Sequence, residues 1–208
     1  MAEYTNSQRS PEQVRRGRRM AVLLFFVGFG PIILATAMYY TGWFNPEGFA
    51  NKGELIHPPV SVAALNLRDS EGEPVEDRFG PDIEDPEWVM LVTSPGLCAE
   101  ECQQMLYLAR QVNIALGKNA NRVNRAAYLE SIPSDLDEEM REEYPSMALL
   151  TTEKTAGSAW PDAVAPDSKP RILLVDPFGN IMMRYNSEHT GKELIKDLKH
   201  LLKLSQIG

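Results

Sequence analysis

The longest uncharged stretch of the chain restricts its fold more than any other feature. Residues 20–44 read MAVLLFFVGFGPIILATAMYYTGWF, without a charged side chain. About 20 apolar residues span the hydrocarbon core of a bilayer, so this run is long enough to cross one. Gly28, Gly30 and Pro31 would weaken a soluble helix, but they are tolerated in a membrane helix. The sequence therefore predicts a single transmembrane helix that anchors the chain.

The two ends of this run indicate its orientation. RRGRR, at residues 15–19, precedes the run, and four aromatic residues end it, namely Tyr39, Tyr40, Trp43 and Phe44. Aromatic side chains collect at membrane interfaces, and basic residues stay on the cytoplasmic side. We therefore expect residues 1–19 to form a cytoplasmic basic arm and the body of the chain to be exported. In a bacterial cell this corresponds to a single-pass inner-membrane protein with a periplasmic domain.

A cleaved signal peptide is the alternative interpretation of the same segment. ATA, at residues 35–37, has the small-x-small form of a cleavage site. However, the apolar region of a signal peptide is only about 7–15 residues long, and an aromatic belt has no role in a discarded peptide. These observations favour the anchor. Both interpretations export the body to an oxidising compartment, where a disulfide can form.

Charge is distributed unevenly along the chain. The formal net charge is -8, yet residues 1–40 hold five arginines and two glutamates, a net charge of +3. The remainder therefore carries -11. A nucleic-acid partner would favour a basic face, so the acidic body argues against nucleic acid as the main partner. Hydrophobic residues make up 43% of the chain, which is enough for a packed core.

Beyond the anchor, the sequence predicts a linker and one domain. Residues 45–59, NPEGFANKGELIHPP, are typical of a linker, and residues 60–208 are left for a domain of common size. Apolar or alternating runs predict strands at 61–67, 88–94, 122–130, 146–152, 171–176 and 180–186. Helical spacing and capping signals predict helices at 99–117, 134–144 and 190–204. Strands that alternate with helices indicate an α/β fold with helices on both faces of a sheet.

The only two cysteines, Cys98 and Cys102, lie where a predicted buried strand meets the following helix. The carboxyl end of a strand is a common place for functional residues in α/β folds. The partial positive charge of a helix N-terminus stabilises a thiolate and lowers the thiol pKa. Cys102 lies one helical turn beyond Cys98, so the two sulfurs can form a small ring or chelate one soft ion. The pair is a candidate redox dithiol or metal clamp.

Two structural interpretations compete with these. A disulfide here would close a ring of five residues, which removes little entropy from the unfolded chain and stabilises weakly. Alternatively, both thiols are buried and unreactive. Glu100 and Glu101, between the cysteines, are expected to raise the thiol pKa values and oppose the effect of the helix end. In a reactive pair, we expect Cys98 to be the nucleophile, because it is nearer the helix start, and Cys102 to be the resolving thiol.

The order of these elements resembles that of the thioredoxin superfamily. KPRILLVDPFGNIMMRY, at residues 169–185, resembles its C-terminal hairpin, in which a proline, usually cis, precedes a strand facing the dithiol. Pro170 matches the position of this proline, although an ordinary proline at a strand edge would fit the same location. The resemblance implies a thioredoxin-like central mixed sheet flanked by helices, preceded here by the single transmembrane helix.

Within the superfamily, the three residues between the cysteines resemble the SCO family, since ordinary thioredoxins have two. SCO proteins are membrane-anchored, exported copper chaperones and thiol reductases that help to build the copper centre of cytochrome c oxidase. The resemblance implies Cys98 and Cys102 as a catalytic pair or as copper ligands. It also implies a cytochrome c oxidase subunit, or another assembly factor, as the partner. Two thiolates suit the soft ion Cu(I).

The sequence also departs from the SCO pattern. SCO copper sites add a histidine shortly before the strand that enters the final hairpin, but residues 153–169 contain none. The three histidines lie elsewhere, with His57 in the predicted linker, His189 after the hairpin and His200 in the last helix. Of these, His189 would approach the dithiol only if its loop folded back. The missing histidine therefore shifts weight from stable copper binding toward thiol exchange.

Three functions remain open after this comparison. The first is a membrane-anchored thiol–disulfide protein that assists the assembly of respiratory cytochrome c oxidase. The second is an SCO-type Cu(I) chaperone that uses the two cysteines. The third is a non-catalytic assembly or docking factor, in which the cysteines form a structural disulfide. The sequence indicates no cofactor other than copper.

Overall fold

The apolar run forms most of one long helix in the computed structural model, α1 (Pro11–Thr41). The helix begins inside the predicted basic arm, at a proline, which is well tolerated in the first turn of a helix. None of its described residues is buried, and an 18-residue window of it has a mean hydropathy of 2.3. The length and composition of α1 are consistent with a single-pass anchor or a signal sequence.

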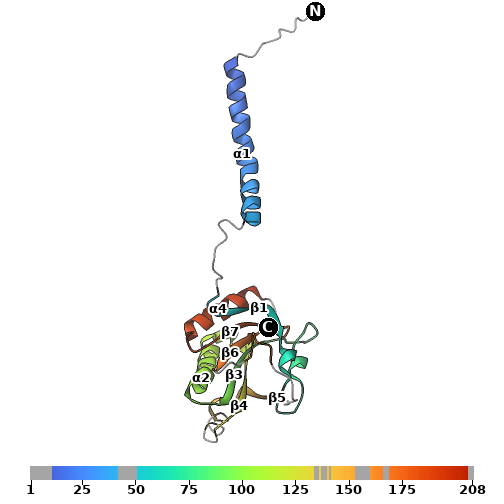
Figure 1. Ribbon diagram of the computed structural model, residues 1–208, viewed down its shortest axis with the longest axis vertical. Helices are drawn as coiled ribbons and strands as arrows, with labels where there is room; N and C mark the ends of the chain where they lie inside the picture. The colour runs from blue at the N-terminus through green and yellow to red at the C-terminus, as the bar shows by residue number, and fades with distance from the viewer. Residues whose placement is uncertain are drawn as a thin grey trace, which may run out of the picture. The chain divides into compact units, whose positions relative to one another are not determined.

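The structure describes residues 11–41, 51–133, 136, 140, 142–152, 160–165 and 169–205. Several predicted features fall wholly or partly outside the described residues, namely Trp43 and Phe44, linker residues 45–50, the helix at 134–144 and the histidine-free loop at 153–169. Residues 1–49 and 50–208 form two separate compact units, and the second contains the sheet (Figure 1).

A seven-stranded mixed sheet organises the second unit (Figure 1). Its strand order is β1-β7-β6-β3-β4-β5-β2. β3 is parallel to β4 and β4 is parallel to β5, whereas all the other neighbouring strands are antiparallel. The strands are β1 (Glu54–Ser61), β2 (Leu67–Arg68), β3 (Trp88–Leu97), β4 (Val123–Ser131), β5 (Met147–Thr152), β6 (Arg171–Val175) and β7 (Asn180–Tyr185). The strand that leads to the cysteines, β3, is therefore central in the sheet.

The α-helices α2 (Glu100–Ala115) and α4 (Gly191–Leu204) pack against one face of the sheet. A capping box starts α4, because Thr190 and Glu193 exchange side-chain and backbone hydrogen bonds. The buried side chains of both helices and of the facing strands form one apolar cluster. It includes Met90, Val92, Leu106, Ala109, Leu194 and Leu198.

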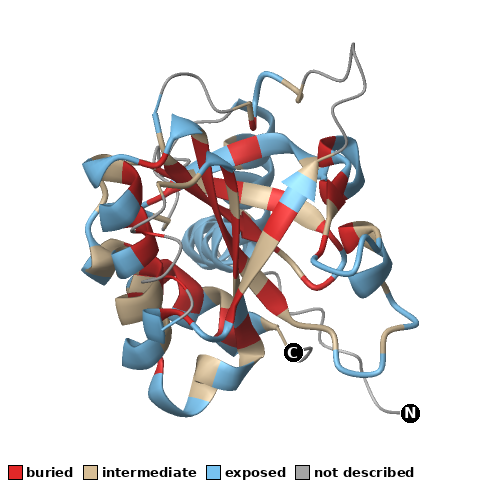
Figure 2. Ribbon diagram, turned by 90° about the horizontal axis from the view of Figure 1, so that it is seen from below, coloured by how far each residue is buried: buried red, intermediate tan, exposed pale blue. Residues whose placement is uncertain are grey.

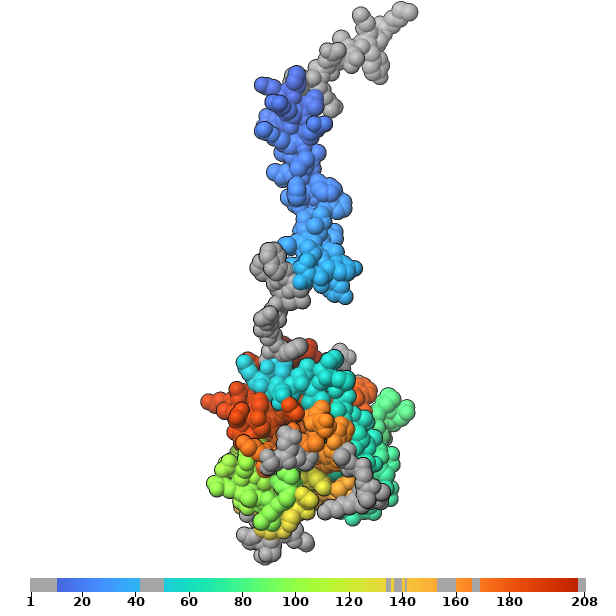
Figure 3. Space-filling model, viewed as in Figure 1, coloured from blue at the N-terminus to red at the C-terminus, as the bar shows by residue number. Residues whose placement is uncertain are grey.

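Residues 62–87 cover the second face and contain two short 3-10 helices, η1 (Val62–Leu65) and η2 (Val75–Arg78). A second buried cluster lies beneath them. It includes Leu65, Leu67, Leu91, Leu173 and Ile181. Figure 2 shows the buried residues running along the strands, and Figure 3 shows α2 and α4 on one side of the unit and residues 62–80 on the other. The predicted mixed sheet with flanking helices is confirmed, with 3-10 helices on the second face.

Two local predictions are wrong. The strand predicted at 61–67 is a 3-10 helix over most of its length, and Asn66, with φ of 48°, ends that helix in the left-handed conformation. In addition, residues 54–59 of the predicted linker belong to β1, which pairs with β7 at the edge of the sheet. The ordered sheet thus begins earlier in the chain than the expected boundary near Val60.

Candidate functional site

The candidate site begins where β3 ends. The sequence predicts a strand at 88–94, before Pro95 and Gly96, but β3 continues to Leu97. Between Ser94 and Leu97 the register with β4 shifts, and Gly96 has φ of 65°, a conformation that favours glycine. A shift of this kind marks a bulge, which bends a strand and changes the direction of the side chains that follow.

Cys98 follows the bulge, and Cys102 lies in the first turn of α2. The Cys98 N–H donates a hydrogen bond to the carbonyl oxygen of Ser131 in β4, over 2.9 Å. Ala99 is extended and precedes α2, and its carbonyl accepts a hydrogen bond from the Gln103 N–H. A disulfide joins Cys98 and Cys102, whose Cα atoms lie 5.2 Å apart. The helical turn thus brings the two sulfurs together, as their spacing predicts.

Both cysteines are fully buried, with exposed fractions of 0%. They belong to the same apolar cluster as Met105 of α2 and Leu129 of β4. By contrast, Leu97 immediately before the pair is 60% exposed. The disulfide therefore lies in the core below an exposed leucine, and attack on either sulfur requires the strand-to-helix connection to move.

Pro170 lies at the same end of the sheet as the disulfide. It directly precedes β6, whose first residue, Arg171, pairs with Thr93 of β3. The position before the hairpin strand agrees with the superfamily pattern. The peptide bond before Pro170 is trans, however, since the only cis peptide bond among the described residues joins His57 and Pro58. A direct role for Pro170 beside the cysteines stays a prediction.

Two neighbours of the cysteines on β4 were missed by the sequence interpretation. Ser131 accepts the hydrogen bond from Cys98, and a carboxylate oxygen of Glu130 accepts one from the Gly96 N–H, over 2.7 Å. The predicted order of strand, helix and strand could have indicated both residues, because it implies that β3 and β4 are parallel. The strand after α2 runs beside β3 in the same direction, so its carboxyl end lies beside the dithiol.

The two glutamates between the cysteines differ in exposure. Glu100 is exposed and accepts a hydrogen bond from the Gln104 side chain over 3.4 Å, whereas Glu101 is half-buried. Because a disulfide carries no thiol proton, their expected effect on the thiol pKa values concerns only the reduced pair. That effect stays a prediction.

The histidines do not join the cysteines in a metal site. His57 is exposed on β1 rather than in a linker, and His200 is exposed on α4. The Nδ1 atom of His189 lies 2.7 Å from the Oδ1 atom of Asn186, and its ring packs edge-on against Tyr185. No group of three or more His, Cys, Asp or Glu side chains in the described part of the chain is arranged to hold a metal ion. The expected role of Cys98 and Cys102 as copper ligands stays a prediction.

The mixed sheet, the disulfide before α2 and the long apolar N-terminal helix define a class of thioredoxin-like protein. Residues 88–205 match the family described as transmembrane-like, thioredoxin-like, C-terminal domain, and residues 11–42 match the transmembrane-like, N-terminal domain. The chain therefore belongs to this transmembrane-like, thioredoxin-like family. A comparison with curated proteins gives no match.

Several solved structures are similar to this chain at low sequence identity. Yeast Sco1 is 16% identical with a TM-score of 0.53, and the match covers 76% of this chain and 100% of that one. Copper-bound ScoI from Arabidopsis thaliana is 16% identical with a TM-score of 0.49, covering 71% and 98%. A thiol:disulfide interchange protein from a Bacteroides species is 15% identical with a TM-score of 0.45, covering 74% and 91%. At these identities the likeness concerns the fold alone.

Proposed function

We propose that the chain is a membrane-anchored, exported thiol–disulfide exchange protein whose reactive pair is Cys98 and Cys102. The observation that carries the proposal is the disulfide between them, at the junction of the central strand and α2 in a thioredoxin-like fold. As argued above, a five-residue ring stabilises a fold weakly, so a disulfide here has little value as a staple.

The exchange starts from the reduced pair. The Cys98 thiolate attacks one sulfur of a partner disulfide, forming a mixed disulfide and releasing the other partner sulfur as a thiolate. The Cys102 thiolate then attacks Cys98 Sγ, which forms the Cys98–Cys102 disulfide and releases the second partner thiolate. Two electrons pass to the partner, which becomes a dithiol after taking up two protons. An exported dithiol reductant must return Cys98 and Cys102 to the reduced form.

The buried cysteines must become accessible to the partner before exchange can occur. Because both cysteines are 0% exposed, exchange requires a local opening of residues 95–99. Exposed Leu97 stands next to Cys98 and would be the first apolar contact for a partner. The rate of exchange is then set by the opening equilibrium as well as by the thiolate.

The partner of this exchange is proposed from the resemblance to SCO proteins. The spacing of the cysteines resembles that of SCO proteins, so we propose a cytochrome c oxidase subunit or another assembly factor as the partner. A Cu(I) ion is the alternative cargo, held by the two thiolates of the reduced pair. The apolar helix α1 supports an anchor in the bacterial inner membrane, with its basic N-terminal end in the cytoplasm.

A second candidate function is favoured by the same burial. A docking factor whose cysteines only connect β3 to α2 would need no access to either sulfur. In that case the thioredoxin-like body would recognise the partner through its surface.

Trapping and complementation separate these functions. The full chain with Cys102→Ser, purified in detergent, should form a mixed disulfide with a small disulfide probe and retain it, whereas Cys98→Ser should not. The double Cys98→Ser, Cys102→Ser variant should fail to restore oxidase assembly in a deletion strain. Complementation by the folded double variant would instead support docking. Cu(I) that stays with the reduced wild type through desalting, and is lost from Cys98→Ser, would support the carrier.

A further inference from the structure

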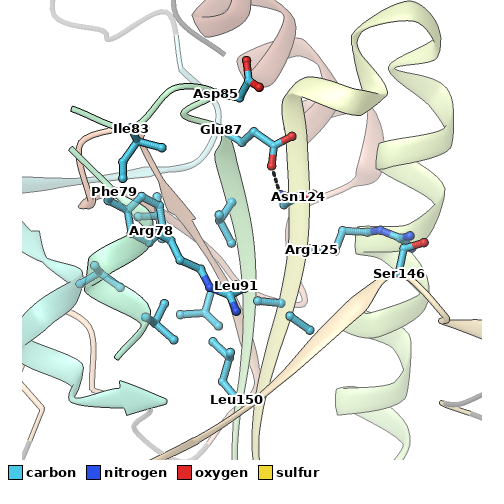
Figure 4. A pocket seen from close by; sticks show the side chains of 16 residues that line it. Arg78, Phe79, Ile83, Asp85, Glu87, Leu91, Asn124, Arg125, Ser146 and Leu150 are labelled. Carbon is cyan, nitrogen blue, oxygen red and sulfur yellow. Dashed lines mark hydrogen bonds between the residues drawn. The ribbon is translucent and has the colours of Figure 1, made fainter. Parts of the chain in front are cut away.

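A cavity of about 510 Å³ lies on the face of the sheet opposite to α2 and α4 (Figure 4). Its floor consists of side chains from β3, β4 and β5, and its roof comes from η1, η2 and the loop that follows them. Small-molecule sites typically measure about 300–1,000 Å³, are mostly apolar and contain a few polar groups. This cavity has that size and that kind of lining, and it is separate from the disulfide.

The floor follows from the alternation of side chains along the strands. Val89 and Leu91 point to this face from β3, and Leu91 is in register with Ala126 of β4. Ala126 is in turn in register with Ala148 of β5. Ala126 and Ala148 thus present only methyl groups to this face, and larger side chains at these positions would fill the cavity. As a consequence, Val89 stays half-buried although it belongs to the central strand.

The charged residues of the cavity are not spread evenly. Figure 4 shows Asp85 and Glu87 together at one end, with the Asn124 amide donating a hydrogen bond to Glu87. Leu150 lies at the other end, and the side chain of Arg78 reaches between the two ends toward Leu91. The cavity therefore has an acidic mouth and a mainly apolar floor that faces one arginine. Burial, together with the neighbouring Asp85, raises the pKa of Glu87. Two acidic side chains thus lie together at this end, and each disfavours the negative charge of the other.

Two arginines also line the cavity, but neither neutralises this end. Arg78 forms an ion pair with Asp69, which is buried outside the cavity lining. Arg125 points away from the cavity, toward Ser146 (Figure 4). The two carboxylates are thus the charges at the mouth, whereas the charge of Arg78 inside the cavity is offset by Asp69.

We propose that this cavity binds a small amphipathic cation, with its apolar or aromatic body over Leu91 and Ala148 and its ammonium group beside Asp85 and Glu87. The volume accommodates a drug-sized molecule, and the position of the carboxylates fixes its orientation. An ammonium group at the mouth would offset the repulsion between the carboxylates of Asp85 and Glu87. This binding is independent of the thiol exchange proposed above, because the cavity and the disulfide lie on opposite faces of the sheet.

Three probes with the same aromatic body test the proposal. Tryptamine, tryptophol and indole-3-acetate carry a cationic, a neutral and an anionic end group. Each is titrated calorimetrically into the full chain in nanodiscs of zwitterionic lipid, and the heat from empty nanodiscs is subtracted. We expect tryptamine to bind on the order of tenfold more tightly than indole-3-acetate, since a carboxylate pair attracts one and repels the other. Equal affinities, or no binding of tryptamine at millimolar concentration, would overturn the proposal.

Variants locate the binding within the molecule. Ala148→Leu fills the floor of the cavity and should abolish the binding of tryptamine, whereas Ala115→Leu, on the exposed end of α2, should leave it unchanged. The paired change Asp85→Asn with Glu87→Gln should remove the preference for the cation but keep the binding of tryptophol. Thermal melts verify that each variant is folded. Unchanged tryptamine affinity in folded Ala148→Leu would show that the cation binds elsewhere and would reject this site.

Discussion

The carboxylate of Asp197, in α4, accepts a hydrogen bond from the hydroxyl of Tyr185, in β7, over 3.1 Å in the core. The same carboxylate accepts hydrogen bonds from the backbone N–H groups of Lys52 and Gly53. Burial and the adjacent Asp197 both raise the pKa of Tyr185, so the tyrosine stays neutral and donates. One buried acid thus connects the start of the second unit to its last helix.

Replacing Asp197 by alanine should destabilise the fold. The variant would remove the acceptor of two backbone N–H groups and leave the buried Tyr185 hydroxyl with only the weak acceptor Met183 Sδ. Each unsatisfied buried group costs about 1–3 kcal/mol. Allowing for relaxation and entry of water, we expect the free energy of unfolding to fall by roughly 2–4 kcal/mol. Urea denaturation followed by circular dichroism measures this change.

Two further variants show whether the hydrogen bonds are responsible. Tyr185→Phe removes one donor and keeps the ring, so a loss of about 1 kcal/mol is expected. Lys199→Ala changes an exposed residue of α4 and should have little effect. A change below about 0.5 kcal/mol in Asp197→Ala would mean that water replaces the carboxylate.

Much of the sheet was predictable because its strands carry strong local signals. The buried run of β3 and the turn between β6 and β7 are clear in the sequence, and both are where they were expected. By contrast, β1 contains Pro58 and Pro59, which suggest a linker. An edge strand tolerates them, because one side of its backbone needs no partner. Whether such a segment pairs with β7 depends on tertiary contacts that no local pattern contains.

The candidate site was predictable in position but not in environment. The junction before α2 follows from a buried strand, two breaking residues and a helical pattern. The complete burial of Cys98 depends on the bulge at Gly96, which keeps β3 in the sheet for three more residues than expected. The buried role of Asp197 was likewise hidden, because an acid in an amphipathic helix ordinarily lies on its exposed face.

Loosening the bulge should make the disulfide easier to reduce. In Glu130→Ala the Gly96 N–H loses its carboxylate acceptor, so residues 95–99 should open more often. If the free energy of this local opening falls by about 1 kcal/mol, dithiothreitol should reduce the disulfide roughly fivefold faster under native conditions. Alkylation of the released thiols at timed intervals, followed by mass spectrometry, measures this rate.

The control for this experiment is an exposed glutamate away from the junction, Glu142→Ala. It should be reduced at the wild-type rate. If Glu130→Ala and the wild type are reduced at the same rate, the disulfide opens through another route, such as fraying of the first turn of α2.

The turn that holds Asp69 should make the fold sensitive to acid. Burial alone would raise the pKa of Asp69, but hydrogen bonds from the Glu73 and Glu71 N–H groups and from Arg78 lower it below the usual 3.8. The folded carboxyl therefore releases its proton at a lower pH than the unfolded chain does. Its stabilising contribution is complete above about pH 3.8 and is lost as the pH falls through the folded pKa.

Asp69→Asn tests this contribution. At pH 7 the variant should unfold at a lower urea concentration than the wild type. This difference should shrink as the pH is lowered below about 3.8, where the wild-type carboxyl becomes protonated. A difference that stays constant down to the lowest pH at which both chains fold would assign the effect to the shape of the turn rather than to its charge.

The contribution of Glu87, at the cavity mouth, to the stability of the fold should show the opposite dependence on pH. Burial, and then the charge of Asp85, raise the pKa of Glu87 above its usual 4.5. The folded carboxyl keeps its proton to a higher pH than the unfolded chain does, so stability falls as the pH rises from about 4.5 through the folded pKa. Above that pKa the cost is complete, and Glu87→Gln should remove it.

Glu87→Gln should therefore be more stable than the wild type at pH 7, by less than about 1 kcal/mol because solvent screens the partly exposed carboxylate. The glutamine carbonyl can still accept the hydrogen bond from Asn124. The difference should vanish below about pH 4.5, and exposed Glu84→Gln should show no gain at either pH. If Glu87→Gln is more stable than the wild type without ligand, Glu87 lowers the stability of the fold, as expected for a residue whose role is to bind a cation. A loss of stability at pH 7 would instead give Glu87 a structural role at the cavity mouth.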